Sequence, residues 1–374
     1  MNIIILATGL MKKEATSLTT VELAQELIEK GHNVKIIGKK GHTIDTKNIP
    51  IIEFKNGFLH TLFSPAFLLR KEKKIDIIYS VSSSPALFIR SLLTKLFTKK
   101  PLLVHTLKSY PIIRDIKIKK KNKFISYIAN SCYWLLKYAD FVTVSTNVHA
   151  DKLIKKGVPK DKIRVVRSFI DHNKFMPLKR LSLKRKYGYE GNKIILYYGA
   201  LWEIKGSNIL IKAIPKILEE HEKNIFICIP RNFTYSLKYK SYLEMKGFAR
   251  QINFIAEEVK IEDYVAMADL VILPYPHLEG TEGNPSCLLE AMACKTPVIT
   301  TNLGGNVELF ENNKTGILIE PKNSEELLKE IISLLNDPVK LKEISNSAFD
   351  HVQQYDWSNI GKKYMNLYKK LLHS

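Results

Sequence analysis

Residues 282–299 read EGNPSCLLEAMACKTPVI, which is the sharpest pattern in the chain. It reads as a loop, then a short helix from Pro285 and Ser286, then a stop before Pro297 and a buried apolar strand. The backbone amides at the start of such a helix can bind a phosphate group. The stretch therefore predicts one loop, helix and strand of an α/β fold, with an anion site at the helix start.

Two carboxylates mark the ends of this pattern. Glu282 lies in the predicted loop and Glu290 about one turn into the helix. Eight residues span roughly 12 Å along a helix axis, which is too far for the paired carboxylates, roughly 5 Å apart, of a retaining glycosidase. The two acids fit different hydroxyl groups of one elongated ligand better. The spacing alone is uninformative, because Glu14 and Glu22 share it on what we interpret as an exposed helix face.

Strand-like and helix-like stretches alternate on both sides of this segment, which indicates parallel sheets with helices on both faces. The alternation pauses at the polar, basic stretch 167–187 and then restarts. We therefore predict two doubly wound domains, residues 1–170 and 171–350, and a helix within 351–374 that packs back on the first domain. The predicted strands are Ile3–Leu6, Val34–Ile37, Ile75–Tyr79, Leu102–His105, Phe141–Ser145, Ile194–Tyr198, Ile225–Ile229, Ile252–Ile255, Leu270–Leu273, Val298–Thr300 and Gly316–Ile319.

Composition narrows the class of protein. The 374 residues are 45% hydrophobic and 25% charged, which excludes a disordered, collagen-like or disulfide-framework chain. The formal net charge is +21, and residues 1–200 hold 38 basic and 14 acidic side chains, whereas residues 201–374 hold 20 and 23. Such a field attracts nucleic acid or an anionic membrane, unless it only reflects a lysine-rich composition. The imbalance between the two halves argues against that last interpretation.

The start of the chain and its cysteines indicate a cytoplasmic location. The apolar run after Met1 is too short for a secretory signal and has no basic segment before it. A membrane-spanning helix requires about 18 or more apolar residues in a row without charge, and the sequence contains no such run. The four cysteines form neither a C-x-x-C pair nor a zinc-site spacing.

The segment 282–290 with its flanking strands resembles the family 4 glycosyltransferases, retaining enzymes of the GT-B fold whose E-x7-E motif matches Glu282 and Glu290. Tyr198–Leu201 followed by Lys205-Gly206 resembles the family's G-R-L-x-x-x-K-G loop, and Leu303–Glu308 resembles its glycine turn. The resemblance covers nearly the whole chain. It implies two Rossmann-like domains with a cleft between them, the first on the acceptor side and the second binding the donor.

The resemblance also implies roles for individual residues. Glu282 would contact the hydroxyls of the donor sugar, Lys205 would neutralise the departing diphosphate, and His105, at the end of a predicted strand, would face the sugar. Alternatively, Glu282 is a surface acid, Lys205 a solvated lysine and His105 a core histidine. No metal or other cofactor is expected. The implied donor-binding residues are Gly283, Asn284, Pro285, Ser286, Leu289, Glu290, which would bind the ribose, and Gly199.

The chain departs from the family pattern at three places. Ala200 stands where the family usually has Arg, so one phosphate-binding cation is absent, and Arg231 is a candidate to replace it. Glu14-Ala15 takes the place of the first-domain glycine pair. Ser168-Phe169 replaces the usual Asn-Gly at the hinge between the domains.

Basic and apolar residues interleave in the first domain. Phe58–Leu69 is followed by Arg70, Lys71, Lys73 and Lys74, and residues 117–123, with five lysines, precede a second apolar set that runs from Phe124 to Leu135. Lysine beside apolar residues suits a membrane interface, although the apolar residues could instead fill the core.

We therefore expect a hexosyltransferase-type enzyme of polysaccharide biosynthesis, peripheral on the inner membrane face, acting on a nucleotide diphosphate sugar and a glycan or lipid-linked acceptor. The alternatives are a catalytically silent relative, a sugar-nucleotide epimerase and a basic nucleic-acid-binding protein. The last lacks a recognised nucleic-acid motif.

Overall fold

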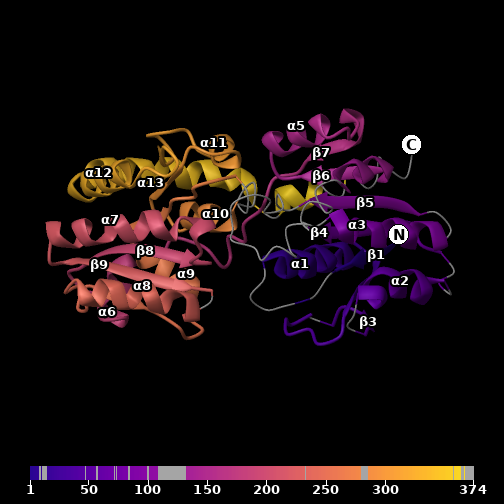
Figure 1. Ribbon diagram of the computed structural model, residues 1–374, viewed down its shortest axis with the longest axis horizontal. Helices are drawn as coiled ribbons and strands as arrows, with labels where there is room; N and C mark the ends of the chain where they lie inside the picture. The colour runs from indigo at the N-terminus through magenta and orange to yellow at the C-terminus, as the bar shows by residue number, and fades with distance from the viewer. Residues whose placement is uncertain are drawn as a thin grey trace, which may run out of the picture. The chain divides into compact units, whose positions relative to one another are not determined.

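The computed structural model describes residues 1–7, 10, 15–46, 48–55, 58–70, 72, 74–82, 85–98, 101–107, 132–231, 233–278, 285–356, 358–363 and 366. The chain divides into two compact units (Figure 1). Unit 1 comprises Met1–Arg167 together with Ile360–Ser374, and unit 2 comprises Ser168–Asn359.

Unit 1 is built on a seven-stranded parallel sheet in the order β3-β2-β1-β4-β5-β6-β7. All of these strands are parallel, but the order in which the chain adds them to the sheet reverses between β1 and β4. Its elements are β1 (Asn2–Leu6), α1 (Ala15–Glu29), β2 (Asn33–Lys39), β3 (Ile51–Phe54), α2 (Phe58–Leu69), β4 (Ile77–Ser82), α3 (Pro85–Phe97), β5 (Leu102–Leu107), η1 (Cys132–Tyr138), β6 (Phe141–Val144), α5 (Asn147–Lys155), η2 (Lys160–Lys162) and β7 (Ile163–Val165).

Unit 2 is built on a six-stranded parallel sheet in the order β10-β9-β8-β11-β12-β13. The order reverses between β8 and β11. Its elements are α6 (Arg180–Lys186), β8 (Lys193–Gly199), η3 (Glu203–Lys205), α7 (Ser207–Glu220), β9 (Asn224–Pro230), α8 (Phe233–Met245), β10 (Ile252–Phe254), α9 (Ile261–Met267), β11 (Leu270–Leu273), α10 (Ser286–Ala293), β12 (Val298–Thr301), α11 (Gly305–Leu309), β13 (Ile317–Ile319), α12 (Ser324–Asn336), α13 (Pro338–Val352) and η4 (Gln353–Tyr355).

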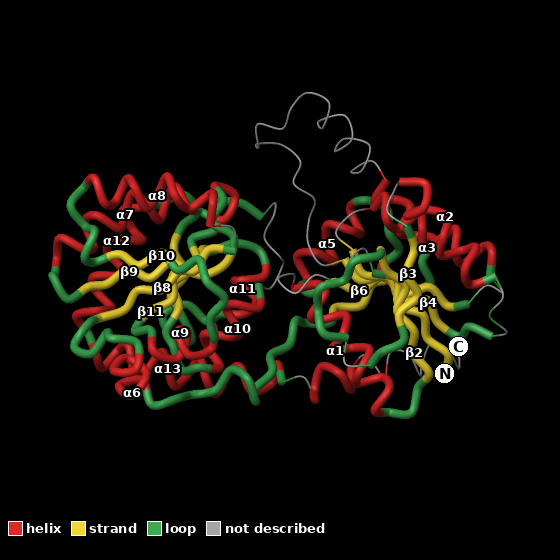
Figure 2. Tube along the Cα trace, turned by 90° about the horizontal axis from the view of Figure 1, so that it is seen from below, coloured by secondary structure: helices red, strands yellow, loops and turns green. Residues whose placement is uncertain are grey.

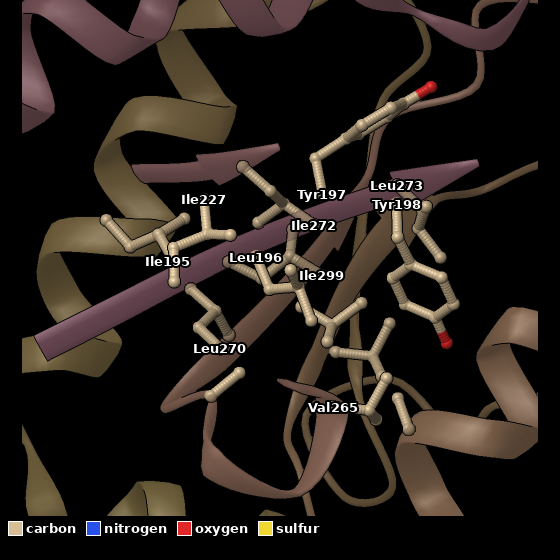
Figure 3. Close-up of a cluster of buried hydrophobic side chains, with 14 of the residues drawn as sticks. Ile195, Leu196, Tyr197, Tyr198, Ile227, Val265, Leu270, Ile272, Leu273 and Ile299 are labelled. Atoms are coloured by element: carbon tan, nitrogen blue, oxygen red, sulfur yellow. The ribbon is translucent and has the colours of Figure 1, made fainter. Parts of the chain in front are cut away.

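Helices cover both faces of each sheet, so the central strands are apolar along their whole length. In unit 2, α7, α8 and α12 lie on one face, and α6, α9, α10 and α13 lie on the other (Figure 2). Figure 3 shows the result around β8, where successive side chains from Ile195 to Tyr198 project to alternate faces and pack against β9, β11 and β12. The predicted α/β fold class is confirmed.

The structure contains three short elements that the sequence analysis did not predict. The short strands β3 and β7 were not predicted, and the basic stretch 167–187, expected to join the domains, contains α6. A helix within 351–374 was predicted to pack on the first domain. In the structure α13 (Pro338–Val352) ends just inside this segment, residues 358–363 are helical, and Ile360–Ser374 groups with unit 1. There Ile360 is buried, and a Cβ on Gly361 would lie 3.5 Å from Glu26 Oε1 of α1.

Candidate active site

The candidate site of unit 2 lies where the strand order reverses. In open α/β sheets, ligands bind beyond the carboxyl ends of the strands at this point. Here Gly199 ends β8 and Leu273 ends β11, and the two strands are paired neighbours. The loops after β8, β11 and β12 lead to α7, α10 and α11, so three helix starts face the same edge of the sheet.

The loop after β8 packs against the end of β11. Gly206 has φ +89°, and a Cβ at this position would overlap the backbone carbonyl oxygen of Pro274. Only glycine tolerates both the conformation and this close approach. The neighbouring residue, Lys205, is half-buried, and its Nζ lies 5.4 Å from the centre of the Tyr275 ring. The packing of Gly206 therefore holds a lysine ammonium group at the point of strand reversal.

Helix α10 brings a carboxylate to the same edge. The Tyr198 hydroxyl lies 2.8 Å from the Cys287 carbonyl oxygen and 3.0 Å from Glu290 Oε2. Burial, followed by the charge of Glu290, raises the pKa of Tyr198 far above its usual range, so this phenol stays protonated and donates. Tyr198 thereby fixes the half-buried side chain of Glu290 against the last residues of β8.

The start of α10 fits an anion. Proline has no side-chain acceptor for the first-turn amides, and Pro285 is the residue that precedes this helix. A ligand oxygen can take that role. Ser286 is half-buried at the first helical position. Leu289 was predicted to bind the donor. In the structure its side chain is completely buried in the core, where it packs beneath α10 and does not face solvent.

A second glycine turn follows β12. Gly304 has φ +48°, and a Cβ there would overlap Cδ2 of Leu278 in the loop after β11. The Asn306 side chain donates to Thr300 Oγ1 at 3.1 Å and to the Thr301 carbonyl oxygen at 3.0 Å. These two bonds fix the start of α11 to the end of β12. The predicted glycine turn therefore packs against the loop after β11, at the same edge of the sheet as Lys205 and Glu290.

The structure does not describe every predicted residue. Glu282, Gly283 and Asn284 lie outside the described residues, as do residues 117–128 of the basic first-domain segment. Among the described residues, no group of three or more His, Cys, Asp and Glu side chains could hold a metal ion. Gly199, Lys205, Pro285, Ser286 and Glu290 all lie at or beside the carboxyl edge of the unit 2 sheet.

Arg231 also reaches this edge. It follows β9, its backbone amide donates to the Gly199 carbonyl oxygen at 2.8 Å, and its side chain is exposed. The residue after Gly199 is Ala200, which has no charge. A cation is therefore present on the neighbouring strand end, beside the position that the sequence leaves without one.

His105 does not lie at the end of a strand. Strand β5 runs on to Leu107, and the His105 ring is fully buried within it, edge-on to Phe88 at 4.9 Å between ring centres. Neither ring nitrogen has a hydrogen-bond partner among the described residues. Burial, and then the charge of Arg90, lowers the pKa of His105 to about 3. His105 is thus a neutral residue inside unit 1, where the prediction had it face the sugar.

Arg90 is a buried cation that the sequence reasoning missed. Its guanidinium donates to the carbonyl oxygens of Ala7 at 2.9 Å and Leu6 at 3.1 Å, where β1 ends at the strand reversal of unit 1. Its side chain is fully buried, and burial lowers its pKa to about 10. The sequence offered one signal, an arginine in the middle of the mostly apolar helix Pro85–Phe97.

The low pKa of His105 predicts a pH-dependent stability. The unfolded chain takes up a proton at His105 below about pH 6.5, whereas the folded chain does so only near pH 3. The free energy of unfolding should therefore fall by about 1.4 kcal/mol for each pH unit between these values. The free energies of unfolding of the wild type and His105→Phe, measured by urea titration from pH 7 to pH 4, should differ in their pH dependence by this amount. Equal pH dependences would show that the folded chain protonates His105 at the same pH as the unfolded chain.

Two family models match the chain. The model described as Glycosyltransferase Family 4 matches residues 17–174, and the model described as Glycosyl transferases group 1 matches residues 180–351. An uncharacterised glycosyltransferase of Methanocaldococcus jannaschii is 29% identical over 237 residues, which is 61% of this chain and 59% of that protein. The chain therefore spans less than two thirds of the length of this relative.

Two further comparisons cover more of the chain. The GPI3 subunit of phosphatidylinositol N-acetylglucosaminyltransferase from Saccharomyces cerevisiae is 22% identical over 93% of this chain and 78% of its own length. The crystal structure of Anabaena Alr3699/HepE in complex with UDP-glucose superposes with a TM-score of 0.82 at 19% identity, covering 99% of this chain and 100% of that one. This likeness shows a shared fold.

Proposed function

The chain belongs to the family 4 glycosyltransferases, and we propose that it moves a sugar from a nucleotide diphosphate sugar to a membrane-associated glycan or lipid-linked acceptor, with retention of configuration. The observation that carries the proposal is the strand-end site of unit 2. There a lysine at 205, a carboxylate at 290 and the start of α10 meet at the edge where α/β sheets bind ligands. The UDP-glucose complex of the Anabaena protein supports this class of donor.

Charge at this site fits a departing nucleoside diphosphate. As the bond from the anomeric carbon to the diphosphate breaks, negative charge develops on the phosphate oxygen. A fixed cation and preorganised amides stabilise that charge without a metal ion. In our proposal Lys205 is the cation, the first amides of α10 bind the phosphate, and Arg231 replaces the cation absent at Ala200.

The carboxylates bind the neutral parts of the donor. We assign Glu290, held by Tyr198, to the ribose hydroxyls and Glu282 to the sugar hydroxyls. His105 has no role in the proposed reaction, because its ring is buried inside β5.

Two observations support an acceptor at an anionic membrane, on the cytoplasmic leaflet. The first 200 residues carry a net charge of +24, and such a field attracts anionic lipid. The yeast relative acts, by its name, on phosphatidylinositol. Among the described residues, none of the helices combines the length and the apolar composition needed to cross a bilayer.

Calorimetric titration with UDP and with GDP tests the donor site. Binding of one nucleotide, weakened in Lys205→Ala, would support an enzyme or a silent relative. Absence of binding to either, with tight and salt-sensitive binding of nucleic acid, would instead favour a nucleic-acid-binding protein. A silent relative would bind the nucleotide but release none from a nucleotide sugar, and Ala200 is the feature that keeps this alternative open.

A further inference from the structure

Helix α2 of unit 1 turns an apolar face to solvent. Its sequence, FLHTLFSPAFLL, contains no Asp, Glu, Lys or Arg. Phe63 is 49% exposed and Phe67 is 75% exposed, and residues four apart lie on the same side of a helix. The opposite side, including Ala66 and Leu69, is buried. Surface helices normally present charged residues outward, so this face is unusual.

Two neighbouring elements continue this face. Helix α3 packs against α2 and against η1, and all three contribute to one buried cluster. Figure 2 shows α2 and α3 on the same side of the sheet. Lys95 near the end of α3 forms an ion pair with Asp140, just after η1. We call the exposed apolar side chains on these three elements the apolar surface: Phe63, Phe67, Leu68, Leu96, Phe97, Trp134 and Tyr138.

Cations lie around and within the apolar surface. Lys137 Nζ lies 5.1 Å from the ring centre of Trp134 and 5.2 Å from that of Tyr138. Arg70, directly after α2, is exposed, and the side chain of Lys74 is 76% exposed. Apart from the buried Arg90, residues 58–100 hold seven basic and two acidic residues.

We propose that the apolar surface is where unit 1 docks onto an anionic lipid bilayer. Aromatic and aliphatic side chains enter the boundary between headgroups and acyl chains, while lysine and arginine bind lipid phosphates. A symmetric dimer through the same surface would bring Lys137 and Arg70 of both copies together, and this like-charge contact opposes it. The inference rests on the membrane acceptor of the proposed function and adds the surface that reaches it.

Sedimentation with vesicles of phosphatidylglycerol and phosphatidylcholine tests the surface. The double variant Phe63→Ser/Phe67→Ser should bind at least about tenfold more weakly than the wild type, because two exposed rings no longer enter the bilayer. The matched control is Met245→Ser/Val339→Ser, which removes two apolar side chains that are 81% and 67% exposed on unit 2. The control should bind like the wild type.

Three outcomes would overturn the proposal. They are no binding of the wild type at low salt, equal binding by the two double variants, and a concentration-dependent dimer that only Phe63→Ser/Phe67→Ser abolishes while vesicle binding is unchanged. The last outcome would make a second copy of the chain the partner. UDP calorimetry on the same preparations separates this from failure of the donor site, because neither pair of residues lies at the strand ends of unit 2.

Discussion

Replacing Lys205 by alanine is expected to lower the turnover of the nucleotide sugar by about 10²–10³-fold. Lys205 lies in the short helix η3, and its ammonium group is held over the Tyr275 ring beside the point of strand reversal. In the proposed reaction the charge that it offsets grows between the bound substrate and the transition state, as the diphosphate departs. The loss should therefore appear mainly in kcat, with a smaller change in KM for the donor.

A matched control separates this role from the general field of the protein. Lys212 is an exposed residue of α7, and Lys212→Ala removes the same charge from the next element of the chain. Its turnover should equal that of the wild type, whereas Lys205→Arg should recover part of the activity. Equal turnover of Lys205→Ala and Lys212→Ala, measured as released nucleotide, would show that Lys205 does not act on the leaving group.

Replacing Gly206 by alanine is expected to lower the free energy of unfolding of unit 2 by about 3 kcal/mol or more. Two causes add. The residue has φ +89°, which strains any side chain, and the new Cβ would meet the Pro274 backbone, with the carbonyl carbon only 2.7 Å away. Backbone at the end of a central strand cannot move aside as a side chain can. We also expect Lys205, the preceding residue, to lose its position and the turnover to fall.

Gly191→Ala is the control for the backbone conformation alone. Gly191 has φ +80°, and among the described residues no atom lies within 4 Å of a Cβ at this position. Its substitution should cost only about 1–2 kcal/mol. Thermal unfolding of the two variants under the same conditions measures the difference. Equal melting temperatures would mean that the loop after β8 does not press on β11 as the structure has it.

Much of the fold was predictable because the central strands are apolar on both faces. Helix α7 spans Ser207–Glu220, a stretch whose apolar side is continuous. Helix α6 was missed because charged residues hold it in place. Lys184 is buried and pairs with Asp269, and Lys186 pairs with Asp263. A basic segment looks like a linker when its partners lie about 80 residues away.

The sequence predicted those residues of the candidate site that belong to a recognisable loop motif. Lys205 and Glu290 could be found from a motif, and both lie at the expected edge of unit 2. The burial of individual side chains could not be predicted from the motif. His105 and Leu289 were expected to contact the donor, yet both side chains are fully buried. Tyr198, which positions Glu290, is a strand residue whose neighbour across the fold only a structure reveals.

Nucleotide release from a panel of UDP and GDP sugars tests the central claim most directly. The assay compares the wild type with Glu282→Ala, in the presence of anionic vesicles that carry lipid-linked acceptors. We predict release from at least one of these sugars by the wild type and its loss in the variant. Release from none of them, or equal release by the wild type and Glu282→Ala, would contradict the account.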